Sequence, residues 1–383
     1  MKLAPLPKLT IVLCFALLTA ASAASAIAAQ PAAIVSPQVN PDRSVTFRLA
    51  RADAHDVLVA LAGLETPLKM TLSNGVWSAT SAPLESGTYW YSYLVDGREE
   101  LDPVNPSTMP SYAFLNSVVR VPGPGKEPWD RADVPHGAVH RHFYESKLVK
   151  GLPEGRSEYF VYTPPGYESH PSQTYPTLYL LHGLSEGAAD WTAMGGANFI
   201  LDNLIAAGKA KPMVVVMPLG YGDMAVAGES PSADTSFAQL FNASSILFDD
   251  VLLHEILPRV EQDYRVSRSR DARAIAGLSM GGFESLIAAF NRPGKDGASQ
   301  FAWVGSFSTP AMFLPPLEAN EQTAKLRLLW IACGAGDSLL EPNRNLVKEL
   351  VARGYAVKAV ETPGAHIWPV WQRNLADFAQ LLF

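Results

Sequence analysis

The chain has 383 residues, 48% of them hydrophobic, and a formal net charge of −7. A chain of this size can bury one large and one smaller hydrophobic core, so we expect two domains. The 37 acidic residues outnumber the 30 basic ones and leave no basic stripe, which argues against nucleic acid or an anionic membrane as a partner.

Residues 1–29 have the pattern of a secretory signal peptide. Lysines precede an apolar run at 9–18, and small residues at 20–26 offer cleavage sites. The apolar run is too short to span a membrane comfortably. Leu13 stands before Cys14 where a lipoprotein signal needs a small residue, so we expect no lipid anchor and a protein that is secreted or periplasmic.

Short alternating stretches predict a small all-β module at residues 30–121. The expected strands are residues 44–49, 56–61, 69–72, 76–80, 88–95 and 117–121. Asn74-Gly75 and Asp96-Gly97 mark tight hairpins, which favours an immunoglobulin-like β-sandwich. Several aromatic residues of the module could stack on sugar rings or pack in its core: Trp77, Tyr89, Trp90, Tyr91 and Tyr93.

Residues 122–135 are rich in proline and glycine and predict a linker before the second domain, residues 136–383. His136, His140 and His142 lack a carboxylate or cysteine at the spacing of a zinc site, so we expect neither a metal nor a cofactor. Without the leader only one cysteine, Cys333, would remain, which excludes a disulfide framework.

Residues 277–281, Gly-Leu-Ser-Met-Gly, have the pattern of a nucleophile elbow. The apolar residues 274–278 predict a buried strand, and residues 282–290 have helical spacing, so a strand, a tight turn and a helix follow one another. The flanking glycines leave room for neighbouring backbone at that turn. We therefore predict that Ser279 is a catalytic nucleophile.

An acid and a histidine follow the serine in the chain order of α/β-hydrolases. Asp337 comes after the apolar strand at 327–333, and His366 comes after the alternating strand at 356–362. Glu341 is the alternative acid on the same loop. A histidine would remove the serine proton during attack, and the acid would orient that histidine.

Two backbone amides are needed to hold the negative oxygen of the tetrahedral intermediate. One should be that of Met280, directly after the serine, and the other that of Leu184, in the turn after the buried strand at 177–182. Residues 220–238 predict a long loop after the strand at 213–218, at the end of the sheet where loops often form the substrate rim.

These motifs resemble the esterase-D-like, carbohydrate esterase family 1 feruloyl esterases, which are α/β-hydrolases. The resemblance covers residues 134–383 and rests on short segments: residues 162–167 (Tyr-Thr-Pro-Pro-Gly-Tyr), 180–183 (Leu-Leu-His-Gly), 274–282, 331–334 with Asp337, and 364–366 with Trp371. It implies a doubly wound, mostly parallel sheet, and it puts the triad on Ser279, Asp337 and His366 and the amides on Leu184 and Met280. The all-β part is similar to the early-set modules of glycan-active enzymes, in residues 75–78, 87–91 and 101–106.

From the residues and the resemblance together we expect a serine esterase acting on ester-substituted plant polysaccharide such as arabinoxylan, with feruloyl-type groups favoured over acetyl groups. Trp191, Trp368 and Trp371 are candidates for lining the acyl pocket, although helix packing explains them equally well. The alternatives are an enterobactin-type siderophore esterase and, from another class, a glycan-binding protein with an inactive hydrolase domain. The sequence does not indicate an oligomeric state.

Overall fold

The computed structural model describes residues 34–383, except Leu115 and residues 229–234, 291–299 and 319–322. The predicted leader therefore lies outside the described residues. None of the helices in the described part of the chain is both long and apolar enough to cross a membrane.

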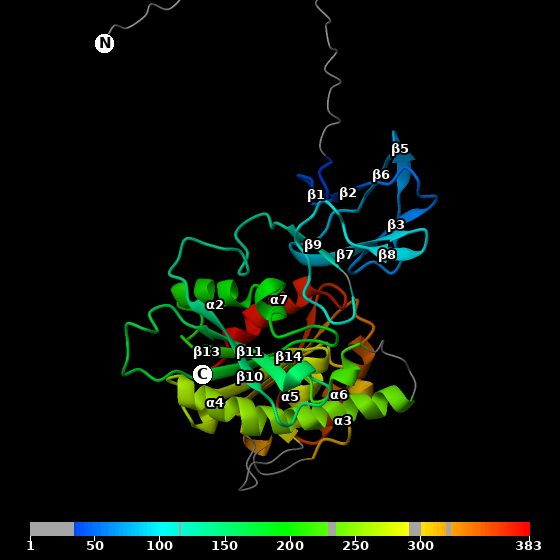
Figure 1. The fold of residues 1–383 in the computed structure, drawn as a ribbon. Coiled ribbons are helices and arrows are strands. Elements are labelled where there is room, and N and C mark those ends of the chain that lie inside the picture. The colour runs from blue at the N-terminus through cyan, green and yellow to red at the C-terminus, as the bar shows by residue number, and fades with distance from the viewer. Residues whose placement is uncertain (1–33, 115, 229–234, 291–299, 319–322) are drawn as a thin grey trace, which may run out of the picture. The chain divides into compact units, whose positions relative to one another are not determined.

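Two antiparallel sheets make up the N-terminal region (Figure 1). One has the strand order β1-β2-β6-β5; the other has the order β4-β3-β7-β8, with β9 paired to β7. The strands are β1 Gln38–Val39, β2 Val45–Ala50, β3 Val57–Leu61, β4 Leu68–Lys69, β5 Thr71–Ser73, β6 Val76–Thr80, β7 Gly87–Val95, β8 Arg98–Glu100 and β9 Ser117–Val121. Alternate residues of β2 and β3 are buried, as the sequence pattern predicts. The small all-β region is confirmed, and its immunoglobulin-like character stays a prediction.

The second part of the chain forms an eight-stranded sheet of order β10-β11-β13-β12-β14-β15-β16-β17. The three strands at the β10 edge pair antiparallel, and the remaining pairs are parallel. The strands are β10 Ala138–Glu145, β11 Arg156–Thr163, β12 Thr177–Leu181, β13 Val214–Pro218, β14 Arg273–Leu278, β15 Trp303–Phe307, β16 Leu328–Gly334 and β17 Val357–Thr362. This is the predicted mostly parallel α/β-hydrolase sheet.

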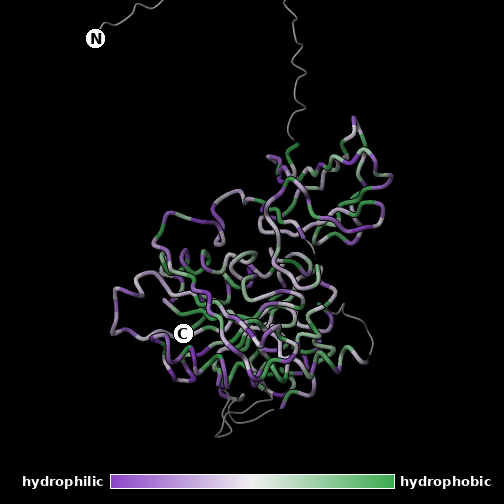
Figure 2. The backbone as a smooth tube through the Cα atoms, in the orientation of Figure 1, coloured by the Kyte–Doolittle hydropathy of each residue, from purple (hydrophilic) through white to green (hydrophobic). Residues whose placement is uncertain are grey.

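Helices cover both faces of this sheet, which is why its central strands are apolar throughout. Leu178 and Leu180 of β12 belong to the core under α2 and α7, whereas Tyr179 and Leu181 belong to the core on the other face. Figure 1 shows α2 and α7 on one face, and α3 to α6 on the other. The helices are α1 Asp190–Ala193, α2 Ala197–Ala206, α3 Thr235–Val251, α4 Leu257–Asp263, α5 Met280–Phe290, α6 Leu340–Ala352 and α7 Trp368–Ala379. Figure 2 shows the hydrophobic residues concentrated in this interior.

The predicted linker contains no helix or strand, but it is packed against the second part of the chain. Trp129 is buried, and Asn203 of α2 donates to the carbonyl oxygens of Pro128 and Asp130, both at 2.8 Å. Residues 34–383 form one compact unit. The domain boundaries given above remain predictions.

Three stretches differ from the expected pattern. The predicted loop at 220–238 contains the 3₁₀ turn η2, Met224–Val226, and ends in α3, which begins at Thr235; residues 229–234 lie outside the described residues. No strand was expected at β11 or β15. The edge strand β10 has exposed or half-exposed residues throughout.

Candidate active site

Ser279 lies between β14 and α5 with a φ of 50°, the tight strand-to-helix turn that the elbow pattern predicts. A side chain at Gly277 would come within 2.5 Å of the Gly281 backbone, and one at Gly281 would come within 2.5 Å of the Leu181 carbonyl oxygen. Both positions therefore require glycine. The Ser279 amide donates to the Phe307 carbonyl oxygen of β15 at 2.7 Å, which ties the turn to the neighbouring strand.

Asp337 and His366 come from the loops after β16 and β17, neighbouring parallel strands whose carboxyl ends meet at one sheet edge. His366 Nδ1 and Asp337 Oδ2 are 2.8 Å apart, and the Leu339 amide donates to the other carboxylate oxygen at 2.9 Å. Burial by itself would raise the pKa of Asp337, but the hydrogen bonds from His366, Leu339 and Ser308 outweigh it and lower that pKa. Asp337 is therefore held as a carboxylate against the imidazole.

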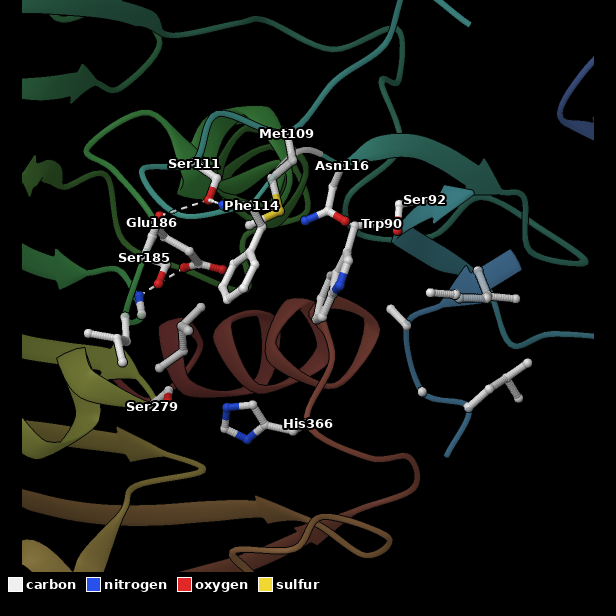
Figure 3. A pocket seen from close by; sticks show the side chains of 18 of the residues that line it. Trp90, Ser92, Met109, Ser111, Phe114, Asn116, Ser185, Glu186, Ser279 and His366 are labelled. Carbon is white, nitrogen blue, oxygen red and sulfur yellow. Dashed lines mark hydrogen bonds between the residues drawn. The ribbon is translucent and has the colours of Figure 1, made fainter. Parts of the chain in front are cut away.

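Ser279 and His366 both line a cavity of about 560 Å³ (Figure 3). Leu278 and Trp371 line it beside them, and Leu184 lies in the turn at its edge. Gly183, Ser185 and Glu186 of the same turn also line it, and the rest of the wall comes from the N-terminal region. Its members include the β7 residues Trp90 and Ser92, residues 60–65, and Met109, Ser111, Phe114 and Asn116 of the segment between β8 and β9.

The turn that carries Leu184 is held by hydrogen bonds on its inner side. The Gly183 amide donates to Glu186 Oε2, and His182 Nδ1 donates to the Gly183 carbonyl oxygen, both at 2.8 Å. Burial, together with the nearby Asp190, raises the pKa of Glu186 well above its ordinary value. Met280, which carries the second predicted amide, begins α5 and is 1% exposed.

Comparison with known proteins identifies the family. The model of a family described as "Putative esterase" matches residues 152–381. The chain belongs to this esterase family. The match begins just before β11 and ends just after α7, so it spans Ser279, Asp337 and His366.

Curated relatives of this esterase act on ester substrates according to their names. This chain is 29% identical to an endo-1,4-beta-xylanase/feruloyl esterase from Xylanibacter ruminicola, over 91% of its own length and 46% of the relative. It is 22% identical to an acetyl esterase from Caldicellulosiruptor saccharolyticus, over 54% of this chain and 82% of the relative. The chain thus spans less than half the length of the xylanase/feruloyl esterase.

Solved structures share the fold of this esterase. A ferulic acid esterase from Anaeromyces mucronatus matches with a TM-score of 0.54 and 22% identity, over 66% of this chain and 93% of that one. An enterobactin esterase from Shigella flexneri matches with a TM-score of 0.64 and 18% identity, over 88% of this chain and 92% of that one. At these identities the likeness is one of fold.

The structure separates the three tryptophans that were candidates for the acyl pocket. Trp371 is 2% exposed and packs against Trp368 at 5.4 Å, but it also lines the cavity, and its ring meets that of His366 edge to face at 4.9 Å. Trp191 and Trp368 are 1% and 0% exposed, and neither is among the residues that line the cavity. Their rings pack against each other at 5.2 Å in the core under α7, which is the packing alternative named for them above.

The aromatic residues of the N-terminal region also divide into residues that pack in the core and one that lines the cavity. Tyr89, Tyr91 and Tyr93 alternate along β7 and point into the core, where they are at most 3% exposed. Trp77 is also buried, and its Nε1 donates to the Arg51 carbonyl oxygen at 2.8 Å. Trp90 lies on the other face of β7 and lines the cavity.

Sequence reasoning missed Glu186 and the segment between β8 and β9. Glu186 stands three residues after Gly183 in a turn that was examined only for its amide, and a buried glutamate gives no hydrophobic signal. The segment belongs to the N-terminal region by sequence, so nothing in its pattern links it to Ser279. Among the described residues, no three histidine, cysteine or carboxylate side chains are grouped to hold a metal ion.

Proposed function

We propose that this esterase is a serine carboxylic-ester hydrolase in which Ser279, His366 and Asp337 form the catalytic triad. The observation that carries the proposal is the 2.8 Å contact between Asp337 Oδ2 and His366 Nδ1, together with the fact that His366 and Ser279 line the same cavity. Asp337 fixes the imidazole with its proton on Nδ1, which leaves Nε2 to accept the Ser279 proton.

The reaction passes through an acyl-enzyme. As Ser279 Oγ attacks the ester carbonyl carbon, its proton moves to His366, and the resulting tetrahedral intermediate collapses when His366 returns that proton to the leaving alcohol. A water molecule then attacks the acyl-enzyme in the same way, with His366 again taking the proton, and the carboxylic acid leaves. The amides of Leu184 and Met280 hold the negative oxygen in both intermediates.

We propose feruloyl-type esters of plant cell-wall polysaccharide as the substrates, with acetyl esters second. A cavity of about 560 Å³ lined by Leu278, Phe114, Met109 and Trp371 is large and apolar enough for a planar aromatic acyl group. The name of the Xylanibacter ruminicola relative joins feruloyl ester hydrolysis to xylan cleavage. Secretion, proposed from the pattern of residues 1–29, agrees with a substrate outside the cell.

The siderophore esterase is the second candidate, because the enterobactin esterase from Shigella flexneri matches 88% of this chain in fold. The charges of the cavity favour the first candidate. No lysine or arginine stands among the described residues that line it, whereas Glu65 and Glu99 do. An anionic catecholate ligand would meet carboxylates there rather than cations.

Hydrolysis of methyl ferulate, acetylated xylan, p-nitrophenyl acetate and an enterobactin-type trilactone by the purified protein tests the proposal. We expect the highest kcat/KM with methyl ferulate. Ser279→Ala should lower kcat on every substrate by about four orders of magnitude or more, because the triad members act as a unit. Ser169→Ala, the same change at an exposed serine in a surface turn, is the control and should leave kcat unchanged.

Each other outcome selects a different interpretation. Hydrolysis of the trilactone in preference to methyl ferulate would replace the substrate proposal with the siderophore alternative. Full activity in Ser279→Ala would refute the triad. Polysaccharide binding without hydrolysis of any of the four esters would support the remaining alternative, a glycan-binding protein with an inactive hydrolase domain.

A further inference from the structure

A segment of the N-terminal region reaches over the turn that carries Leu184. We call residues 107–114, which lie between β8 and β9, the strap. Its base is fixed to β9 because the Val118 amide donates to the Ser107 carbonyl oxygen at 2.9 Å and Thr108 pairs with Ser117 in an antiparallel bridge. The Met109 amide adds a bond to the Asn116 carbonyl oxygen at 3.0 Å. The strap therefore extends from a fixed base.

The tip of the strap holds one carbonyl group of the turn with two donors. Ser111 Oγ donates to the Ser185 carbonyl oxygen at 3.0 Å, and the Tyr112 amide donates to the same oxygen at 2.8 Å. Ser111 Oγ in turn accepts from the amides of Ala113 and Phe114, at 3.3 and 3.2 Å. Figure 3 shows Ser111 next to Ser185 and Glu186 at the edge of the pocket.

The carbonyl that the strap holds belongs to a strained residue. Ser185 has a φ of 65°, a left-handed conformation that is unfavourable for a residue with a side chain. Ser185 directly follows Leu184, so a change in the Ser185 backbone would displace the adjoining peptide groups of Leu184. Such strain persists only where surrounding contacts fix the conformation.

Contacts from the body of the enzyme fix the other side of the turn. Glu186 Oε2 accepts from the Gly183 amide at 2.8 Å, and Tyr221 donates its hydroxyl to the Glu186 carbonyl oxygen at 2.9 Å. The Tyr112 ring meets the Tyr221 ring edge to face at 6.0 Å, so the strap and these contacts are continuous. Ser185 lies between these two sets of contacts, and it is the residue of the turn to which the strap is hydrogen-bonded.

We infer that the strap is a positioning element for catalysis: Ser111 and Tyr112 hold Ser185 so that the Leu184 amide is aimed at the developing oxyanion. This inference rests on the proposed function, since it assigns the amide the role described there. It gives the N-terminal region a part in the chemical step besides its part in lining the pocket. Ser111 acts through Ser185 and Leu184 and takes no direct part in bond making.

Ser111→Ala tests the inference on p-nitrophenyl acetate, a substrate small enough to depend little on the outer pocket. Complete loss of an oxyanion donor lowers kcat by about 10²- to 10³-fold. In this variant the Leu184 amide is still present but misaligned, and Tyr112 still holds Ser185. We therefore expect kcat to fall by about tenfold. KM should stay within about twofold, because the lost interaction acts in the transition state. Ser111→Thr keeps the hydroxyl and should restore kcat.

Two further measurements separate positioning from general damage. The p-nitrophenol burst counts competent active sites, so that kcat is expressed per folded enzyme. A boronic acid that forms a tetrahedral adduct with the serine should bind Ser111→Ala more weakly by the factor by which kcat/KM falls. Ser169→Ala, the same change at an exposed serine outside the strap, is the matched control and should behave as the wild type.

The outcomes distinguish this inference from the proposed function. If Ser279→Ala keeps its activity, both fail. If Ser279→Ala is inactive while Ser111→Ala matches the wild type in kcat and in boronic acid binding, the strap inference alone is wrong. It is also wrong if Ser111→Thr is as slow as Ser111→Ala, or if the change appears in KM with kcat preserved.

Discussion

Asp337 and Glu341 illustrate how a few residues separate a carboxylate that contacts the histidine from one at the surface. Asp337 is 6% exposed and its Oδ2 lies 2.8 Å from His366 Nδ1. Glu341 lies one helical turn further on, in the first turn of α6, where it is paired with Arg344 on the surface. Both were acid candidates in the sequence, because both follow β16. The contact with His366 favours Asp337.

Asp337→Asn should therefore impair the chemical step and leave binding intact. The amide cannot stabilise the imidazolium, and it favours the imidazole tautomer that has no lone pair free for the serine proton. We expect kcat for methyl ferulate to fall on the order of 10³- to 10⁴-fold with KM little changed. Glu341→Gln is the control and should retain wild-type kcat. A large loss in Glu341→Gln and none in Asp337→Asn would reverse the assignment.

At the scale of elements, β7 and α7 are in close contact. Gln372 of α7 accepts from the Thr88 amide of β7 at 3.1 Å and donates to the carbonyl oxygens of Met194 and Gly195, at 3.3 and 3.2 Å. Gly87 begins β7 with a φ of 145°, at a point where α7 leaves no room for a side chain. Helix α7 also carries Trp371 and follows directly on His366, so the same helix supports the pocket and the N-terminal region.

Gly87→Ala should destabilise the protein through this contact. A Cβ there would lie 2.7 Å from Pro369 and 2.9 Å from Gln372 Oε1, whereas a Cβ at Gly97, which also has a positive φ, would meet nothing within 4 Å. Overpacking costs about 1–3 kcal/mol, so Gly87→Ala should lose that much more unfolding free energy than Gly97→Ala, as measured by urea denaturation. Equal losses in the two variants would mean that backbone strain alone is responsible.

Element-scale patterns also explain what could be predicted from the sequence. Periodicity identified β14, β16, β17 and α5, because strands and helices leave regular apolar patterns in the sequence. The loops after those strands carry Ser279, Asp337 and His366, and parallel strands bring their carboxyl ends to one edge. The contact between Asp337 and His366 could thus be expected from topology.

The rest of the pocket depends on contacts between segments distant in sequence. Ser111 lies 74 residues from Ser185, and a short strap with turn residues has no periodicity that would predict where it packs. Trp191 and Trp371 look alike in sequence and are both buried, and their surroundings alone decide that the second also lines the cavity. Pattern analysis identifies elements and motifs, whereas tertiary packing selects which side chains reach the substrate.

For the whole molecule, the buried acids beside the active site make stability depend on pH. Burial raises the pKa of Asp190 to about 7, and it raises that of Glu186 as well. Both side chains bind a proton in the folded protein at pH values where the unfolded chain has lost it. The contribution of these two groups to the unfolding free energy therefore falls as the pH rises from the ordinary aspartate pKa near 3.8 towards 7, since at these sites the folded state then holds more protons than the unfolded state.

Asp190→Asn should reduce this dependence. The asparagine side-chain oxygen can still accept from the Gly187 amide, which donates to Asp190 Oδ2 at 2.5 Å, but it does not titrate. A single group contributes a slope of at most about 1.4 kcal/mol per pH unit, so urea unfolding between pH 4.5 and 7 should give a clearly flatter curve for the variant. Asp133→Asn, at an exposed site, should keep the wild-type slope. Parallel curves for Asp190→Asn and the wild type would mean that Asp190 is ionised in the folded protein, with its charge compensated within the turn that holds Leu184.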